Sequence, residues 1–338
     1  MRSLAAVGGP PTIDLLSIAD LGAAGIAEVI DHALALKSGS GAPERGQPLA
    51  GRQFALLFDK PSLRTRVSFE VGIRRLGGAT TTLTGSDVGL GSREPLGDIA
   101  RTLSRYVDAI VVRIHEHAHL EQLAAAADVP VVNALTNREH PCQALADLLT
   151  IREHLGGFRG RRLAYVGDGN NVCHSLLLGG AAIGLDVSVA CPPGYEPDPT
   201  IVSEARLLAR ESGARVEVVD DAVAAVSGAD AVYTDVWTSM GFEAEAAARQ
   251  RSFAPFRVTS TLMRSAPNAI VMHCLPAHRG QEVDAEVIDG PASVVFDQAE
   301  NRLHAQQAVL IRLLRQAWRR LGEPAPAGQV AAAALYRA

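Results

Sequence analysis

Hydroxyl and guanidinium side chains crowd into residues 60–66 of the chain. Ser62 and Thr65 supply hydroxyl donors, while Arg64 and Arg66 supply forked cationic donors that match phosphate oxygens. The segment follows an apolar run that predicts a strand, and it opens a helical pattern. Because a helix N-terminus presents unpaired N–H groups and the positive end of its dipole, the segment predicts a phosphate site. Taken alone, a capped helix with solvated arginines would explain it almost equally well.

A second set of donors occurs at His140 and Gln143. Pro141 suits the first turn of a helix, so these two side chains lie three residues apart at its N-terminus. There they could donate hydrogen bonds to a carbonyl oxygen, and such bonds strengthen as negative charge develops during attack. Arg113, at the end of a predicted strand, suits the crevice of an α/β sheet. Taken alone, His140, Gln143 and Arg113 would each be better explained as a capping or surface residue than as part of a site.

Three further polar segments also follow predicted strands, at residues 167–171, 235–241 and 273–276. The first is a broken dinucleotide fingerprint that lacks its third glycine, and its asparagines could bind an amino-acid carboxylate or amine. In the second, Asp235 can pair with an ammonium group. In the third, Cys274 could be a thiolate nucleophile or a polar hydrogen-bonding wall. Because no Ser-His-Asp or Cys-His-Asn order is evident, the wall is favoured.

These segments depend on an alternation of strands and helices that runs along the whole chain. Strands are predicted at residues 53–58, 109–114, 163–166, 186–190, 215–219, 231–234, 270–273 and 293–296. Helices are predicted at residues 23–37, 65–76, 141–155, 175–183, 199–212 and 299–321. Such alternation is typical of an α/β fold with parallel sheets covered by helices. We therefore expect two domains, each a parallel β-sheet flanked by helices, with a C-terminal helix returning to the first domain.

The length and composition agree with this organisation. A chain of 338 residues exceeds the usual size of one domain, and the glycine- and arginine-rich residues 156–161 suggest a boundary. We expect domains at residues 1–155 and 156–300, followed by a helix and tail at 301–338. With 47% hydrophobic residues and a net charge of -5, the chain is expected to fold and not to bind nucleic acid.

No apolar run suggests a membrane span or a signal peptide, so a cytoplasmic location is expected. The four cysteines have no compact zinc-ligand spacing, so we expect free thiols and no metal site.

Together the motifs resemble those of the aspartate/ornithine carbamoyltransferase family, and specifically its ornithine branch. The S-T-R-T-R segment of that family is present as Ser-Leu-Arg-Thr-Arg at residues 62–66, and its HPCQ at 140–143. Its GDGNN, D-x-W-x-S-M-G and HCLP motifs follow in order at the three strand ends named above. The resemblance covers residues 12 to 320, and the full set in order is highly specific.

The resemblance implies transfer of the carbamoyl group of carbamoyl phosphate to the δ-amine of L-ornithine, with no metal or organic cofactor, in arginine metabolism. It assigns carbamoyl phosphate to Ser62, Leu63, Arg64, Thr65, Arg113, His140, Gln143, Cys274, Leu275 and Arg302. It assigns ornithine to Asn171, Asp235, Ser239 and Met240. Four residues of the first set act at the reacting centre: Arg64, Arg113, His140 and Cys274. The first domain would bind carbamoyl phosphate and the second ornithine, in a homotrimer or a multiple of trimers.

Two positions depart from the family pattern. Leu63 replaces a threonine, so one hydroxyl is lost although its N–H remains. Gly89 stands where family members often carry Gln or His, in a loop that reaches a neighbouring subunit.

The alternatives are a carbamoyltransferase for putrescine, a modified ornithine or aspartate, a nucleotide-dependent dehydrogenase, and a regulatory paralogue without turnover. The SMG and HCLP motifs disfavour aspartate, and the broken glycine fingerprint disfavours the dehydrogenase.

Overall fold

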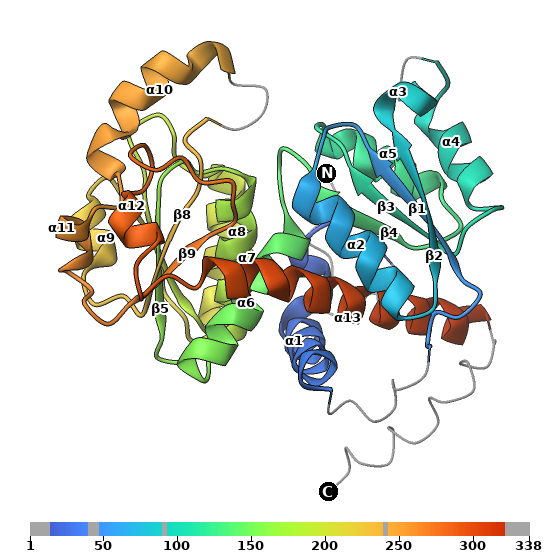
Figure 1. The fold of residues 1–338 in the computed structure, drawn as a ribbon, viewed down its shortest axis with the longest axis horizontal. Helices are drawn as coiled ribbons and strands as arrows, with labels where there is room; N and C mark the ends of the chain where they lie inside the picture. The colour runs from blue at the N-terminus through green and yellow to red at the C-terminus, as the bar shows by residue number, and fades with distance from the viewer. Residues whose placement is uncertain (1–13, 40–46, 90–92, 239–242, 322–338) are drawn as a thin grey trace, which may run out of the picture.

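A computed structural model describes residues 14–39, 47–89, 93–238 and 243–321, which form two parallel β-sheets flanked by helices (Figure 1). The predicted fold class is confirmed. The first sheet has the order β2-β1-β3-β4 and the second the order β7-β6-β5-β8-β9, with every pair parallel. The strands of the first sheet are β1 (Gln53–Phe58), β2 (Ala79–Thr84), β3 (Ala109–Arg113) and β4 (Val131–Leu135). Those of the second are β5 (Arg162–Val166), β6 (Asp186–Ala190), β7 (Val216–Val219), β8 (Ala231–Thr234) and β9 (Ile270–His273).

Helices connect these strands and cover the sheets. Those of the first half are η1 (Ile18–Leu21), α1 (Gly22–Ser38), α2 (Leu63–Arg75), α3 (Gly85–Val88), α4 (Leu96–Leu103), α5 (His117–Ala126) and α6 (Pro141–Leu155). Those of the second half are α7 (Asn171–Ile183), α8 (Pro199–Ser212), α9 (Ala222–Val226), η3 (Glu243–Glu245), α10 (Ala246–Phe253), η4 (Ala254–Phe256), α11 (Ser260–Met263), α12 (Ala285–Ile288) and α13 (Val295–Leu321). Because helices cover both faces, central strands such as β3 are buried along their whole length.

In each sheet the chain adds strands first on one side of a central strand and then on the other, which creates a topological switch point. In the first sheet β1 pairs with β2 on one side and β3 on the other; in the second sheet β5 pairs with β6 and β8. A crevice forms beyond the carboxyl ends of the strands at such a point, and ligands of open α/β sheets bind there. The polar segments at residues 60–66, 167–171 and 235–241 follow the strands β1, β5 and β8 at these points, while residues 140–143 come after β4 and residues 273–276 after β9.

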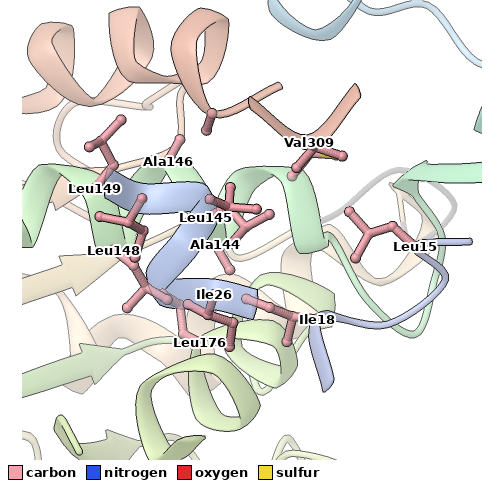
Figure 2. Close-up of a cluster of buried hydrophobic side chains, with 14 of the residues drawn as sticks. Leu15, Ile18, Ile26, Ala144, Leu145, Ala146, Leu148, Leu149, Leu176 and Val309 are labelled. Atoms are coloured by element: carbon pink, nitrogen blue, oxygen red, sulfur yellow. The ribbon is translucent and has the colours of Figure 1, made fainter. Parts of the chain in front are cut away.

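One apolar core joins the two sheets. Figure 2 shows Ile26 of α1, Leu145 and Leu148 of α6, and Leu176 of α7 close together, with Val309 of α13 nearby. The α13 helix runs from the second sheet to pack on α1, α2 and α6, which confirms the returning C-terminal helix (Figure 1). Among the described residues, no helix has the length and apolar character needed to cross a membrane.

Some predicted elements were wrong or missing. The strand predicted at residues 293–296 does not form. Ser293 makes one isolated bridge to Val271, after which the chain turns into α13 at Val295. The β2 and β4 strands were not predicted. In β2 the sequence ATTTLT offers one large apolar side chain, because the strand lies at the sheet edge.

Candidate active site

A cavity of about 630 Å³ lies where the carboxyl ends of the two sheets face each other. Side chains or backbone from β1, β3, β5, β8 and β9, or from the turns directly after them, line it. All predicted site residues within the described ranges also line it: Ser62, Leu63, Arg64, Thr65, Arg113, His140, Gln143, Asn171, Asp235, Cys274, Leu275 and Arg302. The remaining two, Ser239 and Met240, lie outside the described residues.

The N-terminus of α2 forms one wall of the cavity. Ser62 is the N-cap residue, but its side chain makes no capping hydrogen bond. The first-turn N–H groups are therefore available to an anion. Leu63 is 73% exposed at the first helical position, so its side chain leaves that N–H uncovered. Arg66 does not line the cavity and instead pairs with Glu70 at 2.9 Å.

Three arginines converge beside this helix. Thr65 Oγ1 accepts hydrogen bonds from Arg302 Nη2 at 2.8 Å and, more weakly, from Arg113 Nη1 at 3.5 Å. Arg64 Nη2 donates to the Leu275 carbonyl at 2.6 Å and so joins α2 to the end of β9. Burial, with help from Arg302 and Arg64, lowers the pKa of Arg113 to about 10, so Arg113 stays charged at neutral pH. Like charges this close are typical of a site built for a polyanion.

Several buried polar atoms around the cavity have no hydrogen-bond partner within the described part of the chain. They include Nε of Arg113, Nε of Arg302 and Nδ1 of His140. Burial, followed by the charges of Arg302 and Arg113, holds the pKa of His140 well below its usual range, so the imidazole is neutral. A buried donor without a partner is unfavourable by roughly 1–3 kcal/mol, so these residues suit a ligand rich in acceptors.

Gln143 is held from two sides. Its Oε1 accepts from Arg302 Nη1 at 2.8 Å, and its Nε2 donates to Asp147 at 2.8 Å. The His140 backbone N–H donates to Ser175 Oγ at 2.9 Å, which ties the start of α6 to α7. The Gln143 side chain and the His140 backbone are therefore both held in place by hydrogen bonds.

A different set of groups surrounds Asp235, at the end of β8. Its Oδ1 accepts from Cys274 Sγ at 2.9 Å, and its Oδ2 accepts from Asn170 Nδ2 at 2.8 Å. Burial and then the charge of Asp235 raise the pKa of Cys274 well above its ordinary value. The thiol is therefore neutral and acts as a hydrogen-bond donor to Asp235. Asn171 lines the cavity too, but its Nδ2 donates to the Thr136 carbonyl at 2.5 Å.

Asp168 and Arg249 were missed by the sequence analysis. Arg249 Nη1 pairs with Asp168 at 2.8 Å and also donates to the Trp237 carbonyl at 3.0 Å. Burial, opposed mainly by Arg249, raises the pKa of Asp168 to about 6. The pair joins the turn after β5 to α10 and, through Arg249, to the Trp237 carbonyl. The signal available in the sequence was the aspartate within the 167–171 segment.

Asp235, His273 and Cys274 also place possible metal-ligating atoms within 4.8 Å of one another. Both ring nitrogens of His273 are already used, however. Nδ1 accepts from the Leu275 N–H at 2.8 Å, and Nε2 lies 3.2 Å from Glu282. The trio therefore serves to fix the strand end and does not present a free ligand set.

Gly89, one of the two departures from the family pattern, has a structural role at the end of α3. It caps α3 with a left-handed backbone, φ 61°, and a Cβ there would lie 2.6 Å from the Arg93 Cβ. A glutamine at this position would be strained in the present backbone.

Comparison with known proteins agrees with this geometry. Residues 14–153 match the model of the aspartate/ornithine carbamoyltransferase carbamoyl-P binding domain, and residues 159–313 match that of the Asp/Orn binding domain. An ornithine carbamoyltransferase of Methanothermobacter thermautotrophicus is 56% identical over 297 residues, which are 88% of this chain and 97% of that protein. One from Symbiobacterium thermophilum is 53% identical over 302 residues, 89% of this chain and 97% of that protein. The solved ornithine carbamoyltransferase of Pyrococcus furiosus superposes with a TM-score of 0.85 at 50% identity, covering 88% of this chain and 95% of that one. The chain belongs to the aspartate/ornithine carbamoyltransferase family.

Proposed function

We propose that this protein transfers the carbamoyl group of carbamoyl phosphate to the δ-amine of L-ornithine, giving L-citrulline and phosphate. The observation that carries the proposal is the convergence of Arg64, Arg113, Arg302 and neutral His140 on a cavity that also contains the Asp235 carboxylate. Cationic donors suit the phosphate and its leaving charge, while the carboxylate suits a cationic amine. The relatives are named as ornithine carbamoyltransferases, which agrees with this substrate pair.

In the proposed mechanism the phosphate binds at the N-terminus of α2, held by Ser62, the Leu63 N–H, Arg64 and Thr65. Arg113 and Arg302 add charge, and Gln143 and neutral His140 donate hydrogen bonds to the carbamoyl group. Leu275 and Cys274 cover its far side. As the carbonyl oxygen gains negative charge during attack, the preorganised donors stabilise it without having to reorient.

The ornithine amine attacks the carbamoyl carbon in its neutral form. A free amine of this kind has a pKa of about 10, so it must give up a proton to solvent before it attacks. Asp235 and Cys274 orient the amine; a C–N bond forms, the C–O bond to phosphate breaks, and the leaving phosphate takes the proton. No covalent enzyme intermediate is required, and positioning with electrostatic stabilisation supplies most of the acceleration.

The amino-acid end of ornithine is assigned to Asn171, Ser239 and Met240, with Asp235 near the amine. Residues 1–155 would then form the carbamoyl phosphate domain, 156–300 the ornithine domain, and 301–338 the returning helix and tail. The descriptions of the two matching family models support this division.

A colorimetric citrulline assay on the purified protein tests the proposal directly. With saturating carbamoyl phosphate, kcat/KM should fall in the order ornithine, putrescine, aspartate. Putrescine lacks the α-carboxylate and leaves donors unpaired, and aspartate places a second carboxylate beside Asp235. A preference for putrescine or aspartate would overturn the choice of ornithine, whereas absence of any carbamoyl product would overturn the reaction class.

Replacing Cys274 by serine should leave measurable turnover. The high pKa of the thiol leaves almost no thiolate, so its hydrogen bond to Asp235 is the property that matters, and a hydroxyl can make the same bond. Intact-mass spectrometry during turnover should detect no carbamoylated protein. A trapped carbamoyl adduct on Cys274, with complete loss of activity in the serine variant, would instead establish covalent catalysis.

We further propose a homotrimer or a multiple of trimers, acting in the cytoplasm and in arginine synthesis. Light scattering of the purified protein should give three copies or a multiple, and a fully active monomer would refute the proposed assembly. Cell fractionation and complementation of an arginine auxotroph test the location and the pathway.

A further inference from the structure

A fully buried carboxylate, Asp147, lies one helical turn after Gln143 on α6 and does not line the cavity. Its Oδ1 accepts from Gln143 Nε2 at 2.8 Å and from Gln298 Nε2 at 2.7 Å. Its Oδ2 accepts from the Tyr233 hydroxyl at 3.2 Å. One carboxylate therefore receives donors from α6, α13 and β8.

The first of these bonds fixes the orientation of a site residue. The Gln143 amide lies between the Asp147 carboxylate, which only accepts, and the Arg302 guanidinium, which only donates. The Gln143 amide can be placed in two orientations that exchange its oxygen and nitrogen, and only one of them forms hydrogen bonds with both neighbours. The second N–H of Gln143 Nε2 is then left for a ligand, in a fixed direction.

The second bond reaches the opposite wall of the cavity. Gln298 uses its Nε2 on Asp147 and its Oε1 on the His273 backbone N–H, at 2.9 Å. His273 is the last residue of β9 and directly precedes Cys274. The Tyr233 hydroxyl, bonded to Asp147, also lies close enough to Cys274 to lower the pKa of that thiol, against the larger effect of burial.

We propose that Asp147 is a positioning residue of the active site: its carboxylate aligns the Gln143 amide and, through Gln298, the strand end that carries Cys274. The inference rests on the proposed function, because the reaction supplies its readout. Asp147 touches neither substrate, so it acts through the groups that do.

The charge state of Asp147 supports a role other than stability. Burial raises its pKa to about 7, an effect opposed by the three hydrogen bonds and by Arg302. In an unfolded chain the carboxyl titrates near about 3.9, so the native state holds the proton to higher pH and stability falls as pH rises through 7. The ionisable groups that face Asp147 are Arg302 on α13, Tyr233 on β8 and Cys274 after β9. A neutral isostere would therefore suit folding at pH 8 better than the native carboxylate does.

Two substitutions separate positioning from charge. In Asp147→Ala both amides lose their acceptor, and kcat should fall roughly 10- to 100-fold, as is typical when a group behind the ligand shell is removed. In Asp147→Asn the acceptor remains but its hydrogen bonds lose charge assistance. Turnover should fall less in this variant, while Tm at pH 8 should be unchanged or higher than that of the wild type.

The pH profile gives the sharpest readout. The ratio of kcat for the wild type to kcat for Asp147→Asn should decline towards one as the pH falls below 7, because the wild-type carboxyl becomes neutral. Titration of Asp168 or of the substrate affects both proteins equally, so it cancels in this ratio. A double variant provides a further check. When Gln143 is already replaced by alanine, Asp147→Ala should reduce kcat by a factor at least roughly threefold smaller than it does in the wild type, as expected for residues that act through one another.

Thr150→Ala is the matched control. Thr150 is a buried polar residue of α6 that accepts from Asn301 Nδ2 at 3.0 Å and does not line the cavity. It should lower Tm without changing kcat. If Asp147 had a purely structural role, Asp147→Ala would also lower Tm without changing kcat. The kcat ratio of wild type to Asp147→Asn would then not depend on pH, and the effects of Asp147→Ala and Gln143→Ala on kcat would simply multiply. Each of these would overturn the inference while the wild type still makes citrulline; a wild type that makes none would instead refute the proposed function.

Discussion

Arg64→Ala is expected to reduce kcat/KM for carbamoyl phosphate by roughly 100- to 1000-fold, the loss typical of removing one preorganised donor from a developing negative charge. Arg64 lines the cavity and its Nη2 donates to the Leu275 carbonyl at 2.6 Å. The substitution removes a cation from the phosphate end and also a link between α2 and the end of β9. Both losses act on the transition state, so kcat should fall as well as the affinity.

Arg64→Lys should recover only part of this loss. Lysine keeps the positive charge but lacks the planar fork that can serve a phosphate oxygen and a carbonyl together. Arg74→Ala is the matched control, because Arg74 is an exposed guanidinium on the same helix that does not line the cavity. Steady-state kinetics at saturating ornithine, with circular dichroism to verify folding, provide the measurement. Carbamoyl phosphate kinetics within about threefold of the wild type in Arg64→Ala would remove Arg64 from the phosphate site.

Central parallel strands were the most predictable part of the fold. The bounds of the central strands β1, β6 and β8 coincide with the apolar runs in the sequence, because strands covered on both faces are apolar at nearly every position. Edge strand β2 has no such signal, since none of its residues is fully buried. The false strand at residues 293–296 shows the converse error: a short apolar run can also lead into the first turn of a helix, where Val295 is buried but Phe296 is exposed.

The location of the site followed from topology. Segments that trail parallel strands meet at the same sheet edge, so motifs far apart in sequence were expected in one crevice. Which side chain faces that crevice depends on helix phase, which the sequence alone left open. Arg64 and Arg66 are two residues apart and so point about 200° from each other around the helix axis. One lines the cavity and the other pairs with Glu70.

Contacts that hold the site from behind were not predictable from local pattern. The Asp147–Gln298 hydrogen bond joins residues 151 positions apart, and the Asp168–Arg249 pair joins residues 81 apart. Such pairs have no periodicity or fixed spacing, and they depend on how α13 and the loop after β8 fold back. The motif residues that line the cavity are therefore easier to predict than the residues that orient them.

Asp235→Asn is expected to lower kcat/KM for ornithine by roughly 10- to 100-fold, since hydrogen bonds to a charged group contribute about 1.5–3 kcal/mol. Asp235 is buried at the end of β8, where its carboxylate accepts from both Cys274 and Asn170. A neutral amide cannot pair with the cationic amine of incoming ornithine. It would also direct its NH₂ group at one of two neighbours that are themselves donors.

The effect should be confined to the amine substrate. Carbamoyl phosphate is assigned to the α2 N-terminus and the arginines, so its KM at saturating ornithine should change by less than about threefold. Asp220→Asn is the control for charge alone, because Asp220 is an exposed carboxylate of the same half of the chain that does not line the cavity. If Asp235→Asn raised the KM for carbamoyl phosphate and ornithine equally, Asp235 would belong to the general architecture of the site. If ornithine kinetics were unchanged, the amine would bind elsewhere in the cavity, and Asn171 with the loop after Trp237 would be the next residues to test.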